Sequence, residues 1–560
     1  MASLGRLCAI SFRQGPGRVD DCELALPAVA VETPTPVKGE RMASDIVEVE
    51  RRLWSIADQL RANSGLKPSE YSRPVLGLLF LRYADGRFAD VEKQLKPKPG
   101  SRMGAPGPDA FKARGVIYLS LEARFSHLLA LPEGLNLGRA LNQAMEDIEK
   151  HNPDLADALP KNYGAVGDDI LRELIKLLAP VEIDGDAFGR VYEYFMGSFA
   201  EQEMQKGGEY YTPSSIVDLI VEIIEPYHGR ILDPASGSGG MFVHSAQFVR
   251  AHQREPGKEL SIFGIEKVRE TLRLAKMNLA VHGLGGTIME ANSYYDEPFP
   301  VVGQFDFVMA NPPFNVDGVD KEKDAIKLRA DRFPFGLPKL DNGNYLWMSL
   351  FWSALNDNGR AGFVMANSAS DARGSEADIR QKLIESGTVD VIVSISTNFF
   401  YTVTLPCTLW FFDKAKCKTK RKDEVLFIDA RSIFRQVDRA HRDFLPQQIE
   451  LLANIVRLWR GEKPALVHGS DKDLQERGIT KAYANVPGLC KAVITKEIES
   501  HGWSLNPGRY VGASAEIVGT EDFKEQLELL QEEFECLTAE ANEHQTTISM
   551  NVASLLETQQ

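Results

Sequence analysis

The chain of 560 residues is too long for a single hydrophobic core, so its length predicts two to four domains. Its net charge is −15, whereas a protein that grips DNA unaided usually carries a basic surplus, so any nucleic-acid role requires a local basic face or a partner. The six scattered cysteines form no CxxC pair, which argues against a zinc site or a disulfide scaffold and favours a reducing cytoplasm. No apolar run reaches membrane-spanning length.

The first forty or so residues are rich in Pro, Gly and Ala and show no sustained periodicity. They also lack the continuous apolar run that a signal peptide carries after its basic residues. At Met42 the pattern changes, because Ser44 or Asp45 can cap a helix whose apolar residues recur at helical spacing. We interpret residues 1–42 as a disordered leader, or as sequence upstream of a true translation start at Met42.

Helical patterns continue in "PVLGLLFLRYAD", "LNQAMEDIEK" and "ILRELIKLLAP" and predict an all-α domain over 43–180. From about 190 to 430, short β-rich runs alternate with helical stretches, and we assign 181–470 to this second domain. Such alternation is typical of a doubly wound α/β domain with a parallel sheet and right-handed crossovers. The expected strands are "RILDPA", "SIFGIE", "FDFVMA", "AGFVMA", "VDVIVSI" and "CTLWFF".

A C-terminal region over 471–560 ends in a helical and strongly charged stretch. Its apolar residues follow alternating steps of four and three, which is a heptad seam. The seam either folds back on its own domain or binds a partner, and we assign a partner-binding helix here. The seam consists of Phe523, Leu527, Leu530, Phe534, Leu537, Ala541, His544 and Ile548.

A glycine-rich turn, "ILDPASGSGGMF" over 231–242, joins an expected buried strand to an apolar helix. Glycines let the backbone approach a ligand closely at a helix N-terminus. Phe242 stands where a dinucleotide fingerprint has its third glycine, and the turn lacks the Lys-Ser/Thr of a P-loop. The turn therefore favours a nucleoside-like ligand without a pyrophosphate, with a purely structural loop as the alternative.

Further polar residues follow the neighbouring elements. Glu266 ends "IFGIEK", where an acid in a doubly wound sheet can bind both ribose hydroxyls, although an isolated Glu is often a solvated strand end. Asn292 in "EANSYYD" follows a third candidate strand and can hydrogen-bond an adenine edge. Upstream, "GGEYYTP" places Tyr210, Tyr211 and Thr212 before a proline-initiated helix, where they can clamp the other end of the ligand.

Two prolines end the expected strand in "VMANPPFNVD" over 308–317. Proline fixes φ and supplies no N–H, so Pro312 and Pro313 stop the strand abruptly. They stand between an amide, Asn311, and an aromatic ring, Phe314. A proline-terminated strand with a core phenylalanine is the structural alternative.

These motifs in this order resemble the amino-methylating DNA methyltransferases that use S-adenosylmethionine, in the class whose cofactor motifs precede the catalytic one. The flanking stretches "QKGGEYYTP", "NPPFNVDGVDKEK", "RFPFGLPK" and "NFFYTVTLPCTLWFFDK" are similar to the modification subunit of type I restriction–modification systems. The resemblance covers roughly 43–515. Ser236 stands where many relatives have Cys, and Asn292 where related enzymes commonly have Asp; we expect both to be compatible with cofactor binding.

The resemblance implies a Rossmann-like S-adenosylmethionine-dependent methyltransferase domain, with the all-α domain before it and the helical tail after it. It also implies methylation of the N6 amine of a flipped-out adenine in a specific DNA sequence, which protects host DNA from cleavage. The catalytic residues would be Asn311, Pro312, Pro313 and Phe314. The Asn311 side-chain oxygen and the Pro312 carbonyl would accept the two amine hydrogens, and neither a metal nor a covalent nucleophile is needed.

A second aromatic ring should sandwich the flipped base together with Phe314. It is expected in "TNFFYTVTLPC", where we favour Phe400 over Phe399 and Tyr401. The cofactor-binding residues that the resemblance implies are Tyr211, Thr212, Asp233, Ser236, Gly237, Ser238, Gly239, Gly240, Glu266 and Asn292.

In this family, sequence recognition belongs to a separate specificity subunit, two modification subunits flank it, and a nuclease-translocase (restriction) subunit can join. We therefore expect these three partners and double-stranded DNA, and no membrane. One alternative is a protein-glutamine methyltransferase, which carries a similar NPPY motif but needs neither the large helical domain nor the heptad helix. Another is a non-catalytic scaffold, against which the intact stretch from Asn311 to Phe314 argues.

Overall fold

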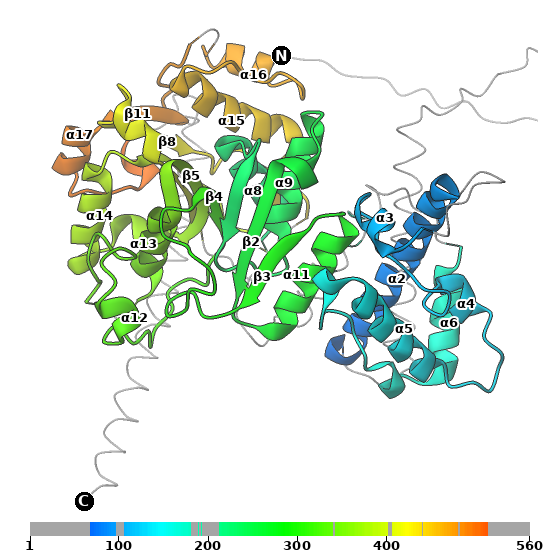
Figure 1. The fold of residues 1–560 in the computed structure, drawn as a ribbon. Coiled ribbons are helices and arrows are strands. Elements are labelled where there is room, and N and C mark those ends of the chain that lie inside the picture. The colour runs from blue at the N-terminus through cyan, green and yellow to red at the C-terminus, as the bar shows by residue number, and fades with distance from the viewer. Residues whose placement is uncertain are drawn as a thin grey trace, which may run out of the picture. The chain divides into compact units, whose positions relative to one another are not determined.

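The computed structural model describes most of the two expected domains (Figure 1). The helix expected after Met42, the heptad seam, Tyr211 and Tyr401 lie outside the described residues. Within those residues, no helix combines the length and apolar character needed to cross a membrane. The described residues are 68–96, 106–180, 212–339, 342–400, 406–438, 441–479 and 482–512, with Gly189, Tyr192 and Met196.

The N-terminal part is all-α, as predicted. The amphipathic helices α5 and α6 bury one face each, because their apolar residues recur at helical spacing. The carboxylate of Asp168, at the start of α6, accepts hydrogen bonds from the backbone N–H groups of Leu137 and Gly138 at 3.1 Å each, so it caps the first turn of α5. The helices are α2 (Pro68–Leu95), α3 (Pro108–Lys112), α4 (Phe125–Leu129), α5 (Leu137–His151) and α6 (Asp168–Leu178), with short 3-10 turns at Pro153–Leu155 and Tyr163–Ala165.

A nine-stranded sheet forms the second domain within the described residues, in the order β11-β8-β6-β7-β5-β4-β1-β2-β3. All six strands expected from the sequence are present, and β11 lies in the region that we assigned to 471–560. The strands are β1 (Gly229–Asp233), β2 (Leu260–Glu266), β3 (Gly286–Glu290), β4 (Phe305–Ala310), β5 (Leu355–Ala366), β6 (Val389–Ser394), β7 (Cys407–Asp413), β8 (Glu424–Asp429) and β11 (Cys490–Ile494), beside a small ribbon of β9 (Arg435–Gln436) and β10 (Arg442–Asp443).

The predicted parallel sheet is instead mixed, because one expected strand, β7, and one strand that the sequence did not predict, β11, run against the others. β7 runs antiparallel to both of its neighbours, β5 and β6, and β11 runs antiparallel to β8. β7 follows β6 along the chain through residues 395–406, and the described part of this connection contains no helix, whereas parallel neighbours usually need a helical crossover. The remaining seven strands run in one direction: β3, β2, β1, β4 and β5 pair parallel along the sheet, and β6 pairs parallel with β8.

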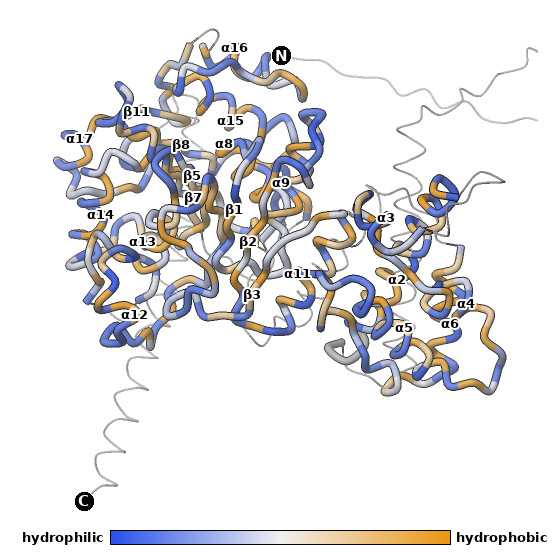
Figure 2. The backbone as a smooth tube through the Cα atoms, viewed as in Figure 1, coloured by the Kyte–Doolittle hydropathy of each residue, from blue (hydrophilic) through white to orange (hydrophobic). Residues whose placement is uncertain are grey.

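Helices cover both faces of the sheet, and successive strand residues alternate between two core clusters. Met309 of β4 lies in the first core cluster, with α8, α9 and α15, whereas Val308 lies in the second, with α13 and α14. The hydrophobic stretches accordingly run along the central strands (Figure 2). The helices are α8 (Ser214–Ile224), α9 (Gly240–Ala251), α10 (Pro256–Glu259), α11 (Arg269–Val281), α12 (Asp324–Lys327), α13 (Asn344–Ala354), α14 (Ser375–Glu385), α15 (Pro446–Arg460), α16 (Asp471–Glu476) and α17 (Thr495–Ser500).

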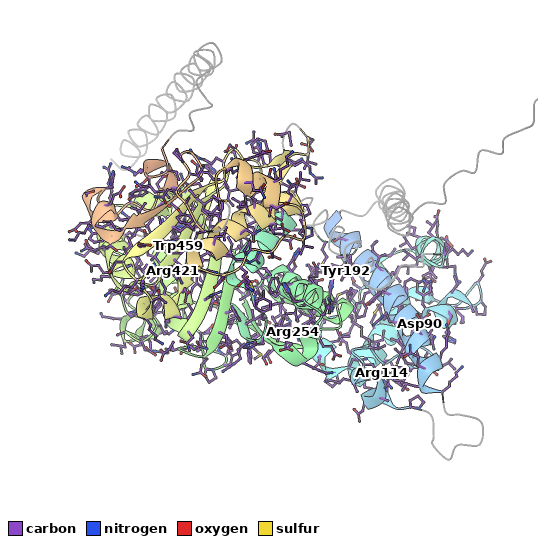
Figure 3. All side chains as sticks on the ribbon, turned by 90° about the horizontal axis from the view of Figure 1, so that it is seen from above. Asp90, Arg114, Tyr192, Arg254, Arg421 and Trp459 are labelled. Carbon is purple, nitrogen blue, oxygen red and sulfur yellow. The ribbon has the colours of Figure 1, made fainter. Side chains whose placement is uncertain are left out.

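A buried ion cluster fixes α15 to β6. The carboxylate of Asp390 accepts from Arg460 at 2.8 Å and from Arg421 at 2.9 Å, and Arg421 lies over the ring of Trp459 at 4.7 Å (Figure 3). Burial alone would raise the pKa of Asp390, but the positive charges of Arg460, Lys416 and Arg421 outweigh it and hold the pKa below its ordinary value. Removing one partner would leave an uncompensated buried charge, so the cluster holds this helix in register with the sheet.

The parallel strands place their carboxyl ends at one edge of the sheet. The glycine turn follows β1, Glu266 ends β2, and Asn311 follows β4, and these three strands are neighbours. Ligands of doubly wound sheets bind outside the carboxyl ends of the strands. The sheet order therefore brings motifs that are far apart in sequence to one place.

Candidate functional site

A cavity of about 910 Å³ lies at this edge, within the roughly 300–1,000 Å³ of ligand-binding pockets. Its wall comes from the segments that follow β1, β2, β3 and β4, and from Ser72, Arg73 and Leu76 of α2. Most of the site residues predicted from the sequence line it. These are Thr212, Asp233, Ser236, Gly237, Ser238, Gly240, Glu266, Asn292, Asn311 and Pro313.

The glycine turn leaves its backbone open toward a ligand. Gly237 and Gly239 have φ values of +52° and +82°, in the left-handed region that favours glycine. A Cβ atom built on Gly237 or Gly240 would meet nothing within 4 Å, whereas one on Gly239 would lie 3.5 Å from Ala275 of α11. Gly237 and Gly240 therefore leave room beside the N-terminus of α9, which fits close approach of a nucleoside-like cofactor such as S-adenosylmethionine.

Glu266 closes the glycine turn onto β2. Its Oε2 accepts a hydrogen bond from the backbone N–H of Gly237 at 2.9 Å, and its Oε1 accepts one from Val268 at 2.8 Å. Sequence reasoning assigned Glu266 to ribose binding and did not anticipate this contact with the turn. The carboxylate thus shapes the cavity wall as well as contributing an acidic group to it.

Asp233, the last residue of β1, is a buried acid at the bottom of the cavity. Burial raises its pKa to about 8, and the negative charge of Glu266 adds to the rise, although the N–H of Ala235 donates to it at 3.0 Å. The raised pKa favours the protonated form of Asp233 relative to an exposed aspartate, and a protonated carboxyl can donate a hydrogen bond.

Asn278 of α11 is a site residue that sequence reasoning missed. Its Nδ2 donates to the carbonyl of Ser238 at 3.0 Å and so fixes the glycine turn from the opposite side to Glu266. Asn278 is fully buried and lines the cavity, and its Oδ1 has no hydrogen-bond partner among the residues described. The sequence feature that could have identified Asn278 is a polar residue within the apolar stretch "KMNLAV".

The Asn292 side chain shapes the loop that follows β3. Its Oδ1 accepts from the backbone N–H of Tyr294 at 3.1 Å, and the backbone N–H of Asn292 donates to Oδ2 of Asp296 at 2.9 Å. An amide oxygen has two lone pairs, so this turn leaves capacity for a further donor. Asn292 lines the cavity, and its contact with an adenine edge stays a prediction from the sequence.

The double-proline stretch begins immediately after β4. Nδ2 of Asn311 donates to Oγ1 of Thr212 at 2.9 Å, which orients the planar amide. Asn311 and Pro313 line the cavity, Pro312 is buried, and Phe314 is half-buried against the first core cluster. The structure thus joins Asn311 and Thr212, which the sequence placed in separate motifs.

Phe400 does not line this cavity. Phe400 is only 5% exposed and belongs to the first core cluster, and Phe399 packs against Phe444 with ring centroids 4.5 Å apart and the rings tilted by 44°. Both phenylalanines therefore occupy core positions in this structure. Base stacking by Phe400 stays a prediction from the sequence.

The strand order, with antiparallel β7 inserted between β5 and β6, and the glycine turn after β1 define a Rossmann-like methyltransferase fold. The family model for N-6 DNA Methylase matches residues 183–517, and the model for the HsdM N-terminal domain matches residues 49–178. The chain belongs to the N-6 DNA methylase family, among the methylase subunits of type I restriction enzymes.

Curated relatives match over most of their length. The type I restriction enzyme MjaIX methylase subunit of Methanocaldococcus jannaschii is 34% identical over 530 residues, which cover 89% of this chain and 90% of the relative. The HindI methylase subunit of Haemophilus influenzae is 34% identical over 440 residues, covering 75% and 93%. Among solved structures, the type I methyltransferase subunit of Streptococcus thermophilus has the same fold, with a TM-score of 0.67 at 22% identity, over 83% of this chain and 99% of that one.

Proposed function

We propose that this protein transfers a methyl group from S-adenosylmethionine to the N6 amine of a flipped-out adenine in DNA, as the modification subunit of a type I restriction–modification complex. The observation that carries the proposal is the shared cavity at the sheet edge. One wall holds the glycine turn and Glu266, and the other holds Asn311, whose amide is oriented by Thr212. A cofactor site and an amine-binding amide therefore face the same space.

The adenine amine is a poor nucleophile because its lone pair is delocalised into the ring. Oδ1 of Asn311 and the backbone carbonyl of Pro312 would accept the two amine hydrogens and draw the nitrogen toward tetrahedral geometry. The bond to Thr212 and the fixed φ of the prolines hold both acceptors in place before the base arrives, which is electrostatic preorganisation. Phe314 would stack on the base, and S-adenosylmethionine, when bound, supplies the electrophilic methyl group.

The proposed cofactor site uses the residues that line the cavity. Glu266 would bind the ribose hydroxyls, Asn292 the adenine edge, and Thr212 with the glycine turn the methionine end. The fit rests on the open side of Gly237 and Gly240 and on the size of the cavity.

We also propose that DNA recognition is supplied by a separate specificity subunit, with a second copy of this chain and a restriction subunit in the full complex, in a cytoplasm. The net charge of −15 supports this proposal, because an acidic chain needs a partner that binds the DNA phosphates. The relatives are named as methylase subunits of type I restriction enzymes, and one structural neighbour comes from a study of complex assembly in a type I system, with a TM-score of 0.56.

The test is incubation of the assembled complex with labelled S-adenosylmethionine and plasmid DNA. The label should appear on adenine N6, and Asn311→Ala should abolish the transfer while leaving calorimetric cofactor affinity nearly intact. Asn356→Ala is a matched control, because Asn356 donates to Asp306 at the amino end of the same strand, and it should retain activity.

Three other results would count against the proposal. Label in a protein glutamine would favour the alternative enzyme class, and cofactor binding without any transfer would favour a scaffold. A loss of cofactor affinity in Asn311→Ala in parallel with activity would contradict the assignment of Asn311 to the target base.

A further inference from the structure

We propose that residues 315–339 and 342–347, here named the brace segment, position the two reacting partners through two separate contacts. Asn344 holds the loop that follows Asn311, and Arg332 holds the loop that follows Asn292. The inference rests on the proposed function and adds two positioning residues to it. Neither residue lines the cavity, so both would act through the loops that they hold.

The first contact is a reciprocal amide pair between Asn315 and Asn344. The backbone N–H of Asn315 donates to Oδ1 of Asn344 at 2.9 Å, and Nδ2 of Asn344 donates back to Oδ1 of Asn315 at 2.8 Å. Asn315 has φ +52°, a left-handed conformation that Asn tolerates better than most residues. The pair therefore locks an unusual backbone turn directly behind the double proline.

The anchor of this pair is rigid. Asn344 is 2% exposed and begins α13, whose following residues are embedded in the second core cluster. The preceding Gly343 donates its N–H to the carbonyl of Val316 at 2.8 Å. A Cβ on Gly343 would lie 2.4 Å from the hydroxyl of Tyr294, so this position requires glycine. The start of α13 thus packs tightly beneath the loop.

The second contact is a buried guanidinium. Arg332 is 3% exposed, and its Nη2 donates to the carbonyl of Ser293 at 2.6 Å. Its Nη1 donates to the carbonyls of Tyr294 at 3.3 Å and Ala325 at 3.4 Å. The planar fork reaches two successive carbonyls of the loop after Asn292, a geometry that a lysine cannot reproduce.

The two contacts have different roles in positioning the reacting groups. The amide pair holds the loop that would position the amine, whereas the Arg332 fork holds the loop that would hold the adenosine of the cofactor. Misplacing a reacting group by about 1 Å costs on the order of 100-fold in rate. Loosening the amide pair should therefore lower kcat, whereas loosening the fork should weaken cofactor binding.

The experiment compares Asn344→Asp and Arg332→Lys in the assembled complex. Asn344→Asp keeps an oxygen that accepts from the backbone N–H of Asn315, but it places a second carboxylate oxygen against Oδ1 of Asn315, where the wild type has an N–H donor. This variant should lower kcat by about 10- to 100-fold with cofactor affinity unchanged. Arg332→Lys keeps the charge but loses the fork, and it should weaken calorimetric cofactor affinity by about tenfold or more.

Matched controls lie nearby. Asn356→Asp disrupts a similar amide contact, 2.7 Å to Asp306, at the other end of β4. Arg329→Lys changes a residue of the same segment whose guanidinium pairs with the carboxylates of Asp331 and Glu297 rather than with the carbonyls of Ser293 and Tyr294. Both controls should leave kcat and cofactor affinity unchanged, even where they lower the melting temperature. Asn315→Gly, at an exposed position, removes the acceptor for Nδ2 of Asn344 but keeps the backbone bond of residue 315 to Oδ1 of Asn344. It leaves α13 unaltered and should reproduce part of the fall in kcat.

Hydrogen exchange supplies a readout that is independent of catalysis. Asn344→Asp should speed exchange in peptides over 312–319 but not over 291–296, and Arg332→Lys should do the reverse. If the wild-type complex does not methylate adenine, the proposed function fails, whereas this exchange pattern still tests the brace segment. Equal losses of kcat and affinity in both variants, or unchanged exchange in both loops, would overturn the division of roles.

Discussion

Glu266→Gln tests the contact that joins the glycine turn to β2. In the wild type, each carboxylate oxygen accepts one backbone N–H, at 2.9 Å from Gly237 and 2.8 Å from Val268. Glutamine is nearly isosteric, but its NH₂ group must face one of these N–H donors. A hydrogen bond to a charged group contributes about 1.5–3 kcal/mol, so the substitution removes about that much from the closed turn or from its ribose contacts.

Because about 1.4 kcal/mol corresponds to a factor of ten, cofactor affinity should fall about 10- to 100-fold. The assay is calorimetric titration of S-adenosylmethionine into the full-length protein. Glu290→Gln is the matched control, since Glu290 is the register partner of Glu266 on β3 but is 54% exposed. Affinity should be unchanged in the control. Equal affinities for wild type and Glu266→Gln would show that Glu266 neither shapes the turn nor contacts the cofactor.

Three further substitutions or truncations test other parts of the chain. Gly237→Val should weaken calorimetric cofactor binding, because φ of +52° costs a side chain about 1–2 kcal/mol and valine also fills the turn; unchanged affinity would remove Gly237 from the site. The pKa of Asp233 is about 8 when folded against 3.8 as its ordinary value, so the folded state binds the extra proton and wild-type stability falls as pH rises through that window. Asp233→Asn lacks this dependence. The difference in unfolding free energy measured in urea, variant minus wild type, should therefore increase between about pH 5 and 8; a difference that stays constant over this range would contradict the raised pKa. Truncation before Glu521 should leave a folded, cofactor-binding protein that co-purifies poorly with its specificity subunit; loss of cofactor binding would instead show that the seam packs on its own domain.

The local patterns were sufficient to predict most of the fold. Helical spacing located α5 and α6, and apolar runs bounded by turn residues located all six expected strands. The direction of β7 was not predicted because it depends on the connection that precedes the strand rather than on the strand's own residues. β3 was harder to predict from an apolar pattern, since it is an edge strand whose residues are mostly exposed.

The residues of the site likewise include some that local sequence predicts and some that it does not. The glycine turn, Glu266 and Asn311 could be predicted because each follows a strand, and parallel strands end at one edge. Asn278 and Arg332 could not, because each side chain serves a backbone carbonyl 40 and 39 residues away, respectively. No local spacing encodes such a contact, and only the tertiary structure brings the two ends together.

The position of β1 between β2 and β4 links the site to the order of folding. β1 and β4 are brought into register by pairs such as Arg230 and Asp306, which lie 76 positions apart in the chain. Contacts of such sequence separation require closure of the intervening loop before they contribute stability, so they slow folding. A chain with native helices but an unpaired β4 would therefore present half a cavity. Cofactor binding during refolding should appear only as the sheet closes, and the ligand would then stabilise that final state by mass action.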